Sequence, residues 1–441
     1  MDAALTTDKQ WFGQPRGLAT LFFTEMWERF SYYGMRALLI LYMVGSVQQP
    51  GIGFSVSTAA QIYGLYTMAV YLAGMPGGYI ADRWIGHYRA VLYGGIIIAA
   101  GHFSMAIPGM PFFFTGLALI VIGTGLLKPN VSSMVGALYD KDDTRRDAGF
   151  SIFYMGINLG AFIAPIVCGF LGQTIDWHLG FGAAGVGMIF GLIQYVRGKK
   201  YLRTVDATVP APPAGIPATV VAVREPLTRT DWARIGAAVI LTLFALLFWA
   251  GFEQAGSSLT LFADRATRLS VFGFTFPSSL FQSAEPLFVI MFSPVFAWLW
   301  LRLRRREPSS PAKFTMGLLL LSLAFALIIP AARIFERSGQ RVSPAWLIGL
   351  YLLQAFGELC LSPVGLSMVT KLSPPRLVGM MMGVWFFATA MGNYLAGWAA
   401  GFLQDRQFSE VFTAAFVSVL VASVVLALLI KPIKKMMGGV N

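Results

Sequence analysis

Residues 25–36 read EMWERFSYYGMR and lie inside an apolar run that extends from about residue 18 to residue 44. The run can cross a bilayer as a helix, which needs about 20 residues. It nevertheless carries four ionisable side chains: Glu25, Glu28, Arg29 and Arg36. Each charge in hydrocarbon costs about 2.5–3.5 kcal/mol on insertion scales. Steps of four, three and four residues place four side chains on one helical face: Glu25, Arg29, Tyr32 and Arg36. The pattern predicts a membrane helix whose charged face meets protein partners or a water-filled cavity.

The composition is typical of a polytopic membrane protein. The 441 residues are 56% hydrophobic and 12% charged, with a mean hydropathy of +0.66, whereas soluble domains carry about 25% charged residues. Cys168 and Cys360 both fall in apolar stretches, so they predict neither a disulfide framework nor a metal site. The polar N-terminus lacks the pattern of a signal peptide, and the first span is therefore expected to stay as a permanent helix.

Twelve apolar spans follow one another along the chain, and they begin near residues 18, 57, 88, 112, 147, 180, 233, 277, 314, 344, 377 and 410. With the N-terminus inside, 24 of the 33 Lys and Arg residues fall in cytoplasmic segments, 6 in outer loops and 3 in spans. This bias places both termini in the cytoplasm and explains the net charge of +12 without a nucleic-acid partner. We expect a multi-pass protein of the inner (plasma) membrane, in contact with the lipid bilayer.

The longest non-apolar segment, residues 199–231, contains VPAPPAGIP and is expected to be a semi-extended cytoplasmic linker. It separates a six-span bundle at residues 1–198 from a second one at residues 232–441. Two parallel six-helix halves are the layout of major facilitator transporters. The loop GGYIADRWIGHYRA, residues 77–90, resembles the loop signature of that superfamily. The predicted fold class is all-α and integral to the membrane, with twelve transmembrane helices in the major facilitator fold.

Polar side chains interrupt the later spans, and in hydrocarbon each one marks a functional site by default. They are Lys128, Tyr154, Asn158, Trp249, Glu253, Gln254, Gln282, Glu285, Glu358 and Ser362. Ordinary interhelical hydrogen bonds remain an alternative for Asn158, Gln282 and Ser362. A structural ion pair remains an alternative for Lys128, Glu253 and Glu358. Across all spans five carboxylates face three fixed cations, so we expect at least one acid to carry a proton.

Several of these stretches resemble the signatures of one transporter family. EMWERFSYYG resembles the ExxERFxYYG signature of the proton-dependent oligopeptide transporter family, and FYMGINLG (residues 153–160) resembles its FYxxINxG signature. Its fourth, seventh and tenth helices are similar to GTGLLKPN (123–130), FEQAGSSL (252–259) and GELCLSPVGLS (357–367). The matches run from residue 25 to about residue 385 and so cover nearly the whole membrane domain.

The resemblance implies a proton-coupled symporter that imports di- or tripeptides by alternating access. It implies that proton coupling uses Glu25, Glu28, Arg29, Lys128 and Glu253. Arg36 is implied to receive the peptide C-terminus and to pair with Glu253 at the outer gate, and Glu358 to receive the peptide N-terminus. The other residues assigned to the peptide pocket are Tyr32, Tyr71, Tyr154, Asn158, Trp249, Glu285, Ser362 and Trp385.

Three features depart from the pattern of the family. Eukaryotic members carry a coupling histidine seven residues before the pocket tyrosine, and here that position is Gly64. The linker is too short for the two extra helices that many bacterial members insert. The eighth-helix asparagine that usually binds the peptide backbone is Glu285 here. An acid at this position adds a titratable group or alters substrate preference.

Other classes of protein fit this sequence less well. The spans contain no metalloprotease, nucleophile-elbow or P-loop motif, so we expect no enzyme activity, no cofactor and no metal. A drug or sugar carrier of the same superfamily and a peptide-sensing receptor remain as alternatives. A zwitterionic peptide needs a cation for its carboxylate and an anion for its amine, and Arg36 and Glu358 supply these. The expected partners are a di- or tripeptide and protons, and the transporter is expected to function as a monomer.

Overall fold

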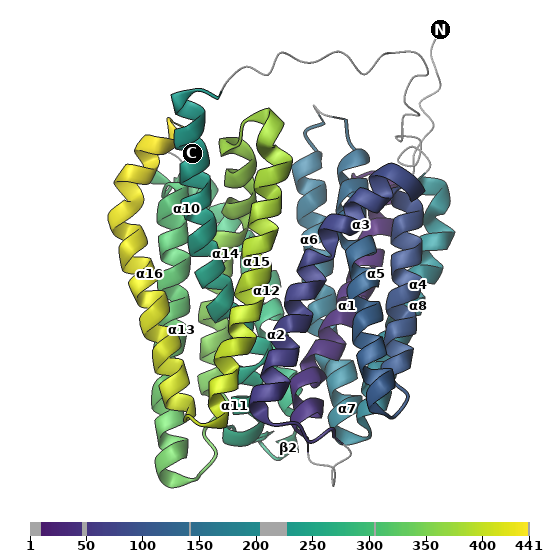
Figure 1. Cartoon of the computed structure of the whole chain (residues 1–441), viewed down its shortest axis with the longest axis vertical. Helices are drawn as coiled ribbons and strands as arrows, with labels where there is room; N and C mark the ends of the chain where they lie inside the picture. Colours follow the sequence, from purple (N-terminus) through teal and green to yellow (C-terminus); the bar gives the residue numbers. More distant parts are fainter. Residues whose placement is uncertain (1–9, 46–50, 141–142, 203–226, 304–305, 440–441) are drawn as a thin grey trace. The chain divides into compact units, whose positions relative to one another are not determined.

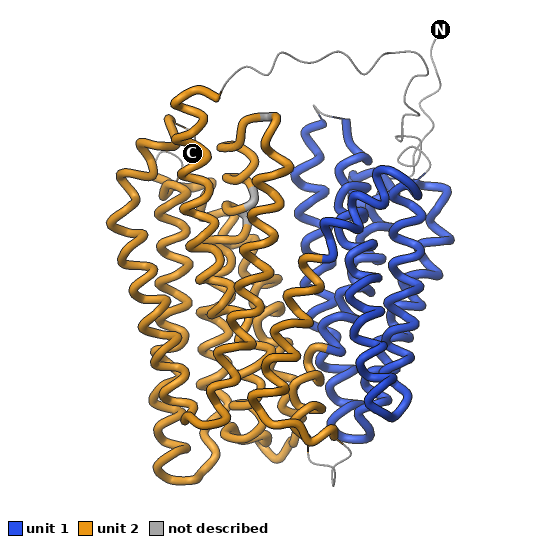
Figure 2. The backbone as a smooth tube through the Cα atoms, viewed as in Figure 1, with its two compact units in different colours: residues 1–35, 73–223 blue, residues 36–72, 224–441 orange. Residues whose placement is uncertain are grey.

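The computed structural model is almost entirely helical and describes residues 10–45, 51–140, 143–202, 227–303 and 306–439. It contains two compact units (Figure 2): unit 1 is residues 1–35 and 73–223, and unit 2 is residues 36–72 and 224–441. The helix α1 (Arg16–Val44) contributes residues to both units. Residues 203–226, which make up most of the predicted linker, lie outside the described residues.

Unit 1 consists of long helices joined by short irregular segments (Figure 1). Besides the first part of α1 it contains α3 (Gly74–Ile80), the π-helical turn η1 (Ala81–Ile85), α4 (His87–Met105), α5 (Met110–Ala137), α6 (Arg146–Ala164), the π-helical turn η2 (Pro165–Gly169), α7 (Phe170–Thr174), α8 (Trp177–Gly198) and the 3-10 turn η3 (Lys199–Tyr201). Within this unit α4 packs against α5 and α8, α3 packs against α5, and α6 packs against α5.

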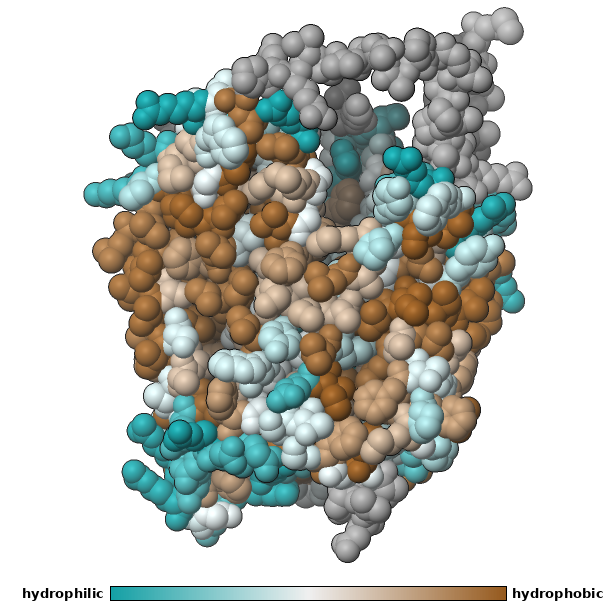
Figure 3. Space-filling model, viewed as in Figure 1, coloured by the Kyte–Doolittle hydropathy of each residue, from teal (hydrophilic) through white to brown (hydrophobic). Residues whose placement is uncertain are grey.

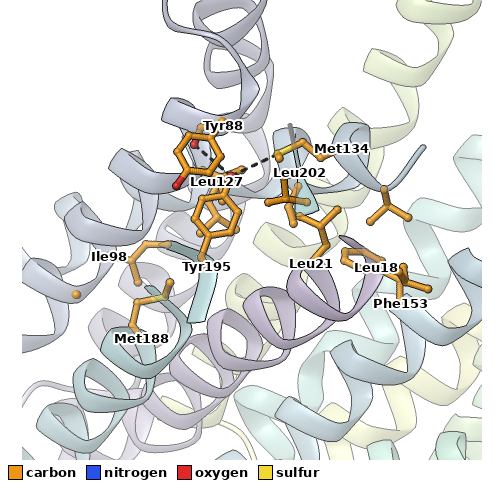
Figure 4. Packing of buried hydrophobic residues seen from close by; sticks show 14 of the residues in the cluster. Leu18, Leu21, Tyr88, Ile98, Leu127, Met134, Phe153, Met188, Tyr195 and Leu202 are labelled. Atoms are coloured by element: carbon orange, nitrogen blue, oxygen red, sulfur yellow. Dashed lines mark hydrogen bonds between the residues drawn. The ribbon is translucent and has the colours of Figure 1, made fainter. Parts of the chain in front are cut away.

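A cluster of buried apolar side chains joins the helices of unit 1 (Figure 4). Leu18 and Leu21 of α1 are fully buried in this cluster. Across it, Tyr88 of α4 and Tyr195 of α8 stack with ring centroids 4.9 Å apart. The Tyr195 hydroxyl donates to the Tyr88 carbonyl oxygen at 3.2 Å. Because Glu25 follows Leu21 by one helical turn, this packing fixes the start of the charged face of α1.

The charged loop predicted at residues 77–90 forms a tight junction between α3, α4 and α5. Gly77 packs directly on the backbone of Gly125, since a Cβ at Gly77 would lie 1.9 Å from the Gly125 carbonyl oxygen. The Asn130 side chain donates to the Gly77 carbonyl oxygen at 3.4 Å, and its Oδ1 lies 2.8 Å from His87 Nδ1. Gly77 therefore serves close helix packing, and Asn130 ties the junction together through Gly77 and His87.

Unit 2 contains α2 (Val56–Leu72), α10 (Arg229–Phe252), the 3-10 turn η4 (Glu253–Gly256), α11 (Ser258–Ala266), strands β1 (Ser270–Val271) and β2 (Phe274–Thr275), the 3-10 turn η5 (Ser278–Ser283), α12 (Ala284–Leu303), α13 (Ser310–Ser338), α14 (Ala345–Leu372), the 3-10 turn η7 (Pro375–Leu377), α15 (Val378–Gly401), the 3-10 turn η8 (Phe402–Gln404) and α16 (Phe408–Met437). Here α10 packs against α14, α15 and α16, α12 packs against α14, and α2 packs against α15 (Figure 1).

The two strands of unit 2 form a hairpin that the sequence analysis did not predict. Ser270 pairs with Thr275 and Val271 pairs with Phe274 in antiparallel register. The two turn residues, Phe272 and Gly273, both have positive φ, at 51° and 82°. A two-residue turn with positive φ at both positions matches the twist of the flanking strands, and glycine is favoured there.

The helices have the lengths and the surfaces of membrane spans. Among the described residues, eight helical stretches are long and apolar enough to cross a membrane. The other four predicted spans correspond to α1, α2, α4 and α15, which have 29, 17, 19 and 24 residues. Helix α1 is not among the eight apolar stretches because charged side chains interrupt it. In each unit the visible face is apolar at mid-height and hydrophilic towards its ends (Figure 3).

Candidate functional site

Helix α1 places three ionisable side chains in the interior of unit 1. Glu25, Glu28 and Arg29 are only 2%, 0% and 3% exposed. Arg29 Nη2 donates to Glu28 Oε1 at 2.7 Å, and Arg29 Nε donates to the other oxygen of the same carboxylate. Arg29 Nε also lies 3.3 Å from Glu25 Oε1. One guanidinium therefore contacts both acids, and its contact with Glu28 is bidentate.

The two acids of this cluster are not equally paired. Arg29 engages both oxygens of Glu28, whereas the buried Oε2 of Glu25 has no hydrogen-bond partner among the described residues. Lys128 of α5 lies close enough to Glu25 to act on it electrostatically. With Lys128 the cluster contains two acids and two cations, so it is formally neutral. Glu25 is the acid that has an oxygen available for a proton.

Helix α6 packs against α1 at the level of this cluster. A Cβ at Gly160 would lie 2.2 Å from the Met26 carbonyl oxygen and 3.0 Å from Arg29 Cβ. On the same helix the Asn158 amide donates to the Tyr154 carbonyl oxygen at 3.0 Å. This bond joins two residues predicted to line the pocket. The close approach of α6 restricts the conformations that Arg29 can adopt.

The neighbouring tyrosine belongs to the same face of α1. The Arg29 guanidinium carbon lies 5.2 Å from the centroid of the Tyr32 ring, a cation–π distance. Tyr32 is buried, at 4% exposed. The first three members of the predicted face, Glu25, Arg29 and Tyr32, are therefore brought together in unit 1.

The later part of α1 carries Arg36 into unit 2. Its Nη2 donates to Glu253 Oε2 in an ion pair that is buried on both sides. Its Nε donates to the Tyr63 hydroxyl of α2 at 2.5 Å. Arg36 and Glu253 are 6% and 4% exposed. Arg36 is therefore bound by an acid and a phenol from two other elements of unit 2, as predicted for Glu253.

Gly256, at the end of η4, allows the backbone to approach this ion pair. A Cβ at Gly256 would lie 1.8 Å from the Tyr63 hydroxyl oxygen and 2.7 Å from Arg36 Nε. Any side chain larger than a hydrogen would displace one of these groups. The stretch FEQAGSSL therefore supplies both the acid and the space in which Arg36 and Tyr63 meet.

Two more acids of unit 2 lie on neighbouring helices. Glu285 is in the first turn of α12, Glu358 is in α14, and the two helices pack against each other. The two carboxyl groups lie close enough to interact electrostatically. Arg36 and Glu253 also lie close enough to Glu285 to interact with it electrostatically. Unit 2 therefore brings together three acids and one arginine.

The predicted aromatic residues of unit 2 lie on the helices around these acids. The Trp385 ring packs on Gly365 of α14, where a Cβ would lie 2.3 Å from Trp385 Cη2. Trp249 packs on α15. Its Nε1 and the Ser362 Oγ are both buried without a hydrogen-bond partner among the described residues. Tyr71 is half-buried at the end of α2.

A model of the POT family matches residues 88–223 and 219–418, which together make up most of the chain. The chain belongs to the POT family. The family predicted from the sequence signatures is confirmed. The protein is a multi-pass membrane transporter, and the POT neighbours described below confirm the twelve-helix major facilitator fold.

Relatives of this POT transporter align with it over almost its whole length. An uncharacterized transporter, YclF, of Bacillus subtilis (strain 168) is 42% identical over 98% of this chain and 97% of its own. The peptide transporter YePEPT of Yersinia enterocolitica is 39% identical, again over 98% and 97%. A di-/tripeptide transporter of Lactococcus lactis is 36% identical over 99% of each chain.

Solved POT structures share the fold. A variant of a peptide transporter POT in complex with alafosfalin has a TM-score of 0.89 and 41% identity, over 98% of each chain. A POT family transporter in complex with 5-aminolevulinic acid has a TM-score of 0.85 and 32% identity, over 97% of this chain and 98% of that one.

The POT chain has no room for a histidine at position 64. A Cβ at Gly64 would lie 2.9 Å from the Tyr394 carbonyl oxygen and 3.2 Å from Gly397 Cα, both on α15. The two glycines let α2 and α15 pack with their backbones in contact. An imidazole at this position would force the helices apart, which accounts for the departure noted in the sequence.

Sequence reasoning missed several polar residues of unit 2. Tyr63 contacts Arg36, but an apolar span rich in tyrosine gave no reason to select it. Tyr351 and Gln354 precede Glu358 by seven and four residues and so lie on the same face of α14. Helical spacing counted backwards from Glu358 would have identified them.

Proposed function

We propose that this POT transporter is a proton-coupled symporter that imports di- and tripeptides by alternating access. The observation that supports this most directly is the buried contact of Arg36 with Glu253 and Tyr63. While Glu253 is ionised, it competes with a substrate carboxylate for the guanidinium. Protonation of Glu253 removes that competition. The proton, through Glu253, and the peptide carboxylate therefore both act on the Arg36 guanidinium. This shared group is the basis of coupling.

The two ends of the peptide meet opposite charges in this scheme. Arg36 receives the C-terminal carboxylate, because a guanidinium fork matches the two oxygens of a carboxylate. Glu358 receives the N-terminal ammonium. The side chains of the peptide face a largely aromatic pocket. Its proposed lining is Tyr32, Tyr71, Tyr154, Asn158, Trp249, Glu285, Ser362 and Trp385.

The cluster of unit 1 returns the proton to the cytoplasm. Glu25 takes the proton on its unpaired oxygen, and Arg29, Glu28 and Lys128 stabilise the ionised form after release. One proton crossing about 100 mV yields roughly 2.3 kcal/mol, and one pH unit adds about 1.36 kcal/mol. Together they support accumulation of a neutral peptide on the order of several hundred-fold.

The names of relatives support the substrate class, since two of them are a peptide transporter and a di-/tripeptide transporter. We place the transporter in the inner (plasma) membrane with both termini in the cytoplasm, because the excess of Lys and Arg falls on that side. We further propose two six-helix bundles, residues 1–198 and 232–441, joined by the linker at 199–231, and function as a monomer.

Uptake of dialanine into proteoliposomes tests the function. An inward acid gradient should drive accumulation that a protonophore abolishes and that other dipeptides, but not sugars, compete. Arg36→Ala should lose dipeptide binding while the protein still purifies as a single species. Competition by sugars would instead favour a carrier for another small molecule. Binding without counterflow would favour a receptor.

A further inference from the structure

A cavity of about 460 Å³ in unit 2 is lined by side chains of α10, α15 and α16. Helices α15 and α16 both pack against α10 (Figure 1). Small residues leave the space open: Ala250 and Gly251 of α10, Ala399 of α15, and Ala414 and Ala415 of α16 all line it. The volume falls within the range of about 300–1,000 Å³ that is usual for ligand sites. The cavity is therefore large enough to hold part of a ligand.

The cavity opens onto the apolar surface of the spans. Two of its lining residues, Trp398 of α15 and Phe402 of η8, are 50% and 47% exposed, and their ring centroids are 4.7 Å apart. Val417 and Val421 follow Ala414 by three and seven residues, so they share its face of α16, and both are exposed. Exposed apolar side chains of a membrane span contact lipid, and tryptophan is enriched beside the headgroups. The occupant of the cavity therefore comes from the bilayer.

One end of the cavity carries a charge of each sign. Arg406, which follows η8, and Glu410, in the first turn of α16, both line it. Arg406 Nη1 lies 3.7 Å from Glu410 Oε2, beyond hydrogen-bond distance, and both side chains are exposed. An exposed pair of this kind contributes little by itself, so both groups can bind another partner. From this end the lining continues along α16 to Ser418 and Val419.

We propose that this cavity binds phosphatidylethanolamine, a phospholipid with a zwitterionic headgroup. The phosphate binds Arg406, because a guanidinium matches the oxygens of a phosphate. The ammonium group binds Glu410, and one acyl chain lies between α15 and α16 in the apolar part of the cavity. An anionic phospholipid matches the site less well, since it offers no cation to Glu410. A soluble zwitterion lacks the chain that the apolar lining accepts.

The cavity also reaches the turn that holds Arg36. Gln254 of η4 lines it, and the Gln254 Oε1 accepts a hydrogen bond from the Ser258 hydroxyl at 2.6 Å. Gln254 directly follows Glu253, whose carboxylate forms the ion pair with Arg36. An acyl chain in the cavity therefore contacts η4 and restrains the turn that positions Glu253.

Native mass spectrometry of the purified full chain tests the headgroup contacts. The delipidated protein is titrated with phosphatidylethanolamine or phosphatidylglycerol that carry the same acyl chains. The wild type should bind phosphatidylethanolamine about fivefold more tightly, which corresponds to about 1 kcal/mol for one charge at a lipid surface. Arg406→Gln should weaken phosphatidylethanolamine binding by a similar factor, and Glu410→Gln should abolish the preference between the two lipids. Equal affinity of the wild type for both lipids would overturn the proposal.

A variant that fills the cavity tests the position of the acyl chain without a change of charge. Ala414→Leu adds bulk to the lining and should weaken phosphatidylethanolamine binding at least fivefold. The matched control is Val421→Leu, an exposed position on the same face of α16 that is not part of the lining. The charge control is Arg341→Gln, at an exposed arginine outside the cavity. Both controls should bind the lipid as the wild type does. Wild-type affinity in Ala414→Leu would refute the cavity as the acyl site.

Hydrogen exchange provides a readout at the turn η4. Phosphatidylethanolamine should slow amide exchange across residues 250–258 in the wild type and should have no such effect in Ala414→Leu. Glycerophosphoethanolamine, which has the headgroup without acyl chains, should leave the exchange unchanged in both proteins. Slowing by glycerophosphoethanolamine alone would show that the apolar part of the cavity is not used. Unchanged exchange in the wild type with bound phosphatidylethanolamine would place the lipid elsewhere and so contradict the assignment.

Discussion

The two charged clusters differ in charge balance and in the origin of their residues. In unit 1, Glu25, Glu28 and Arg29 come from one helix and Lys128 comes from α5, so that two acids meet two cations. In unit 2, Arg36 pairs with Glu253 and lies near Glu285, which in turn lies near Glu358. These four residues come from α1, η4, α12 and α14. The first cluster is local and neutral. The second is assembled from distant segments and carries excess acid.

This difference locates the surplus acids that the sequence shows. Five carboxylates and three cations lie in the spans, and the whole surplus of two acids lies in unit 2. A buried acid without a cation is stabilised by taking up a proton. A proton bound in unit 2 can respond to substrate. A proton bound to Glu25 lies in a cluster whose charges already balance. We therefore propose that protonation linked to substrate occurs in unit 2 and that proton release occurs in unit 1.

The largest effect is expected when the neutral cluster loses its shared cation. Arg29→Gln leaves Glu25 and Glu28 buried with one fewer positive charge, and removal of one partner from a buried pair costs about 3–5 kcal/mol. We expect a strongly lowered melting temperature in detergent and poor yield of monodisperse protein. Arg36→Gln leaves only one paired acid without its partner, and we expect a smaller drop.

The double variant Arg29→Gln with Glu28→Gln supplies the control for that prediction. It removes one charge of each sign, so its melting temperature should recover towards that of the wild type. An unchanged melting temperature in the single Arg29→Gln variant would contradict the paired cluster. Recovery that is equally large with Glu410→Gln in place of Glu28→Gln would point to net charge and not to the contact.

A second prediction concerns Glu25. A driving force of roughly 3.7 kcal/mol, from about 100 mV and one pH unit, lets the wild type concentrate a neutral dipeptide several hundred-fold. Glu25→Gln cannot carry the proton, so accumulation should fall to about unity while exchange of internal for external peptide continues. Gradient-driven uptake and counterflow in the same proteoliposomes separate the two. Glu25→Gln vesicles that still concentrate peptide would remove Glu25 from the coupling path.

The sequence predicts the unit 1 cluster better than the unit 2 cluster, and the reason is physical. Contacts between residues four apart follow from helical geometry, so the helical period alone places Glu25 and Arg29 on one face. The contact between Arg36 and Glu253 spans 217 positions and could be expected only through the family resemblance. Nothing in the sequence selects Tyr63, because its role depends on the space that Gly256 leaves.

In the fold, too, some features follow from the sequence and others do not. Spans and their order follow from hydropathy, because about 20 apolar residues are needed to cross the bilayer. The breaks between helical segments are harder to foresee. The hairpin at residues 270–275 depends on two positive φ angles, and only Gly273 hints at them in the sequence. The π-helical turns at Ala81–Ile85 and Pro165–Gly169 have no reliable local signal.

A third prediction uses glycines to compare how tightly each cluster is enclosed. Gly160→Ala would place a methyl group 2.2 Å from a carbonyl oxygen of α1, and Gly256→Ala would place one 1.8 Å from the Tyr63 hydroxyl oxygen. Overpacking of this kind costs about 1–3 kcal/mol. The backbone carbonyl near Gly160 can move less than the Tyr63 side chain near Gly256. We therefore expect the larger loss of thermal stability for Gly160→Ala. We expect the larger loss of dipeptide affinity for Gly256→Ala.

The control for both glycine variants is Gly383→Ala on α15, where a Cβ would meet nothing within 4 Å. It should retain or slightly raise the melting temperature, because alanine favours helix over glycine. If Gly256→Ala lowers thermal stability without altering affinity, then the close approach of η4 serves packing alone and does not position Arg36.

The smallest effect is expected from Tyr63→Phe, which removes one hydrogen bond from Arg36 and leaves its ion pair with Glu253 in place. A hydrogen bond of this kind contributes about 0.5–1.5 kcal/mol. The bond stabilises the substrate-free arrangement, and a ligand shifts an equilibrium only through its different affinity for the two states. Loss of the bond should therefore make Arg36 more available and raise dipeptide affinity about two- to tenfold, measured as Kd on purified protein. A lower affinity would mean that Tyr63 also contacts Arg36 or the peptide in the bound state. In that case Tyr63 would belong to the peptide site and not only to the resting ion pair, and the contrast between the two clusters would have to be redrawn around it.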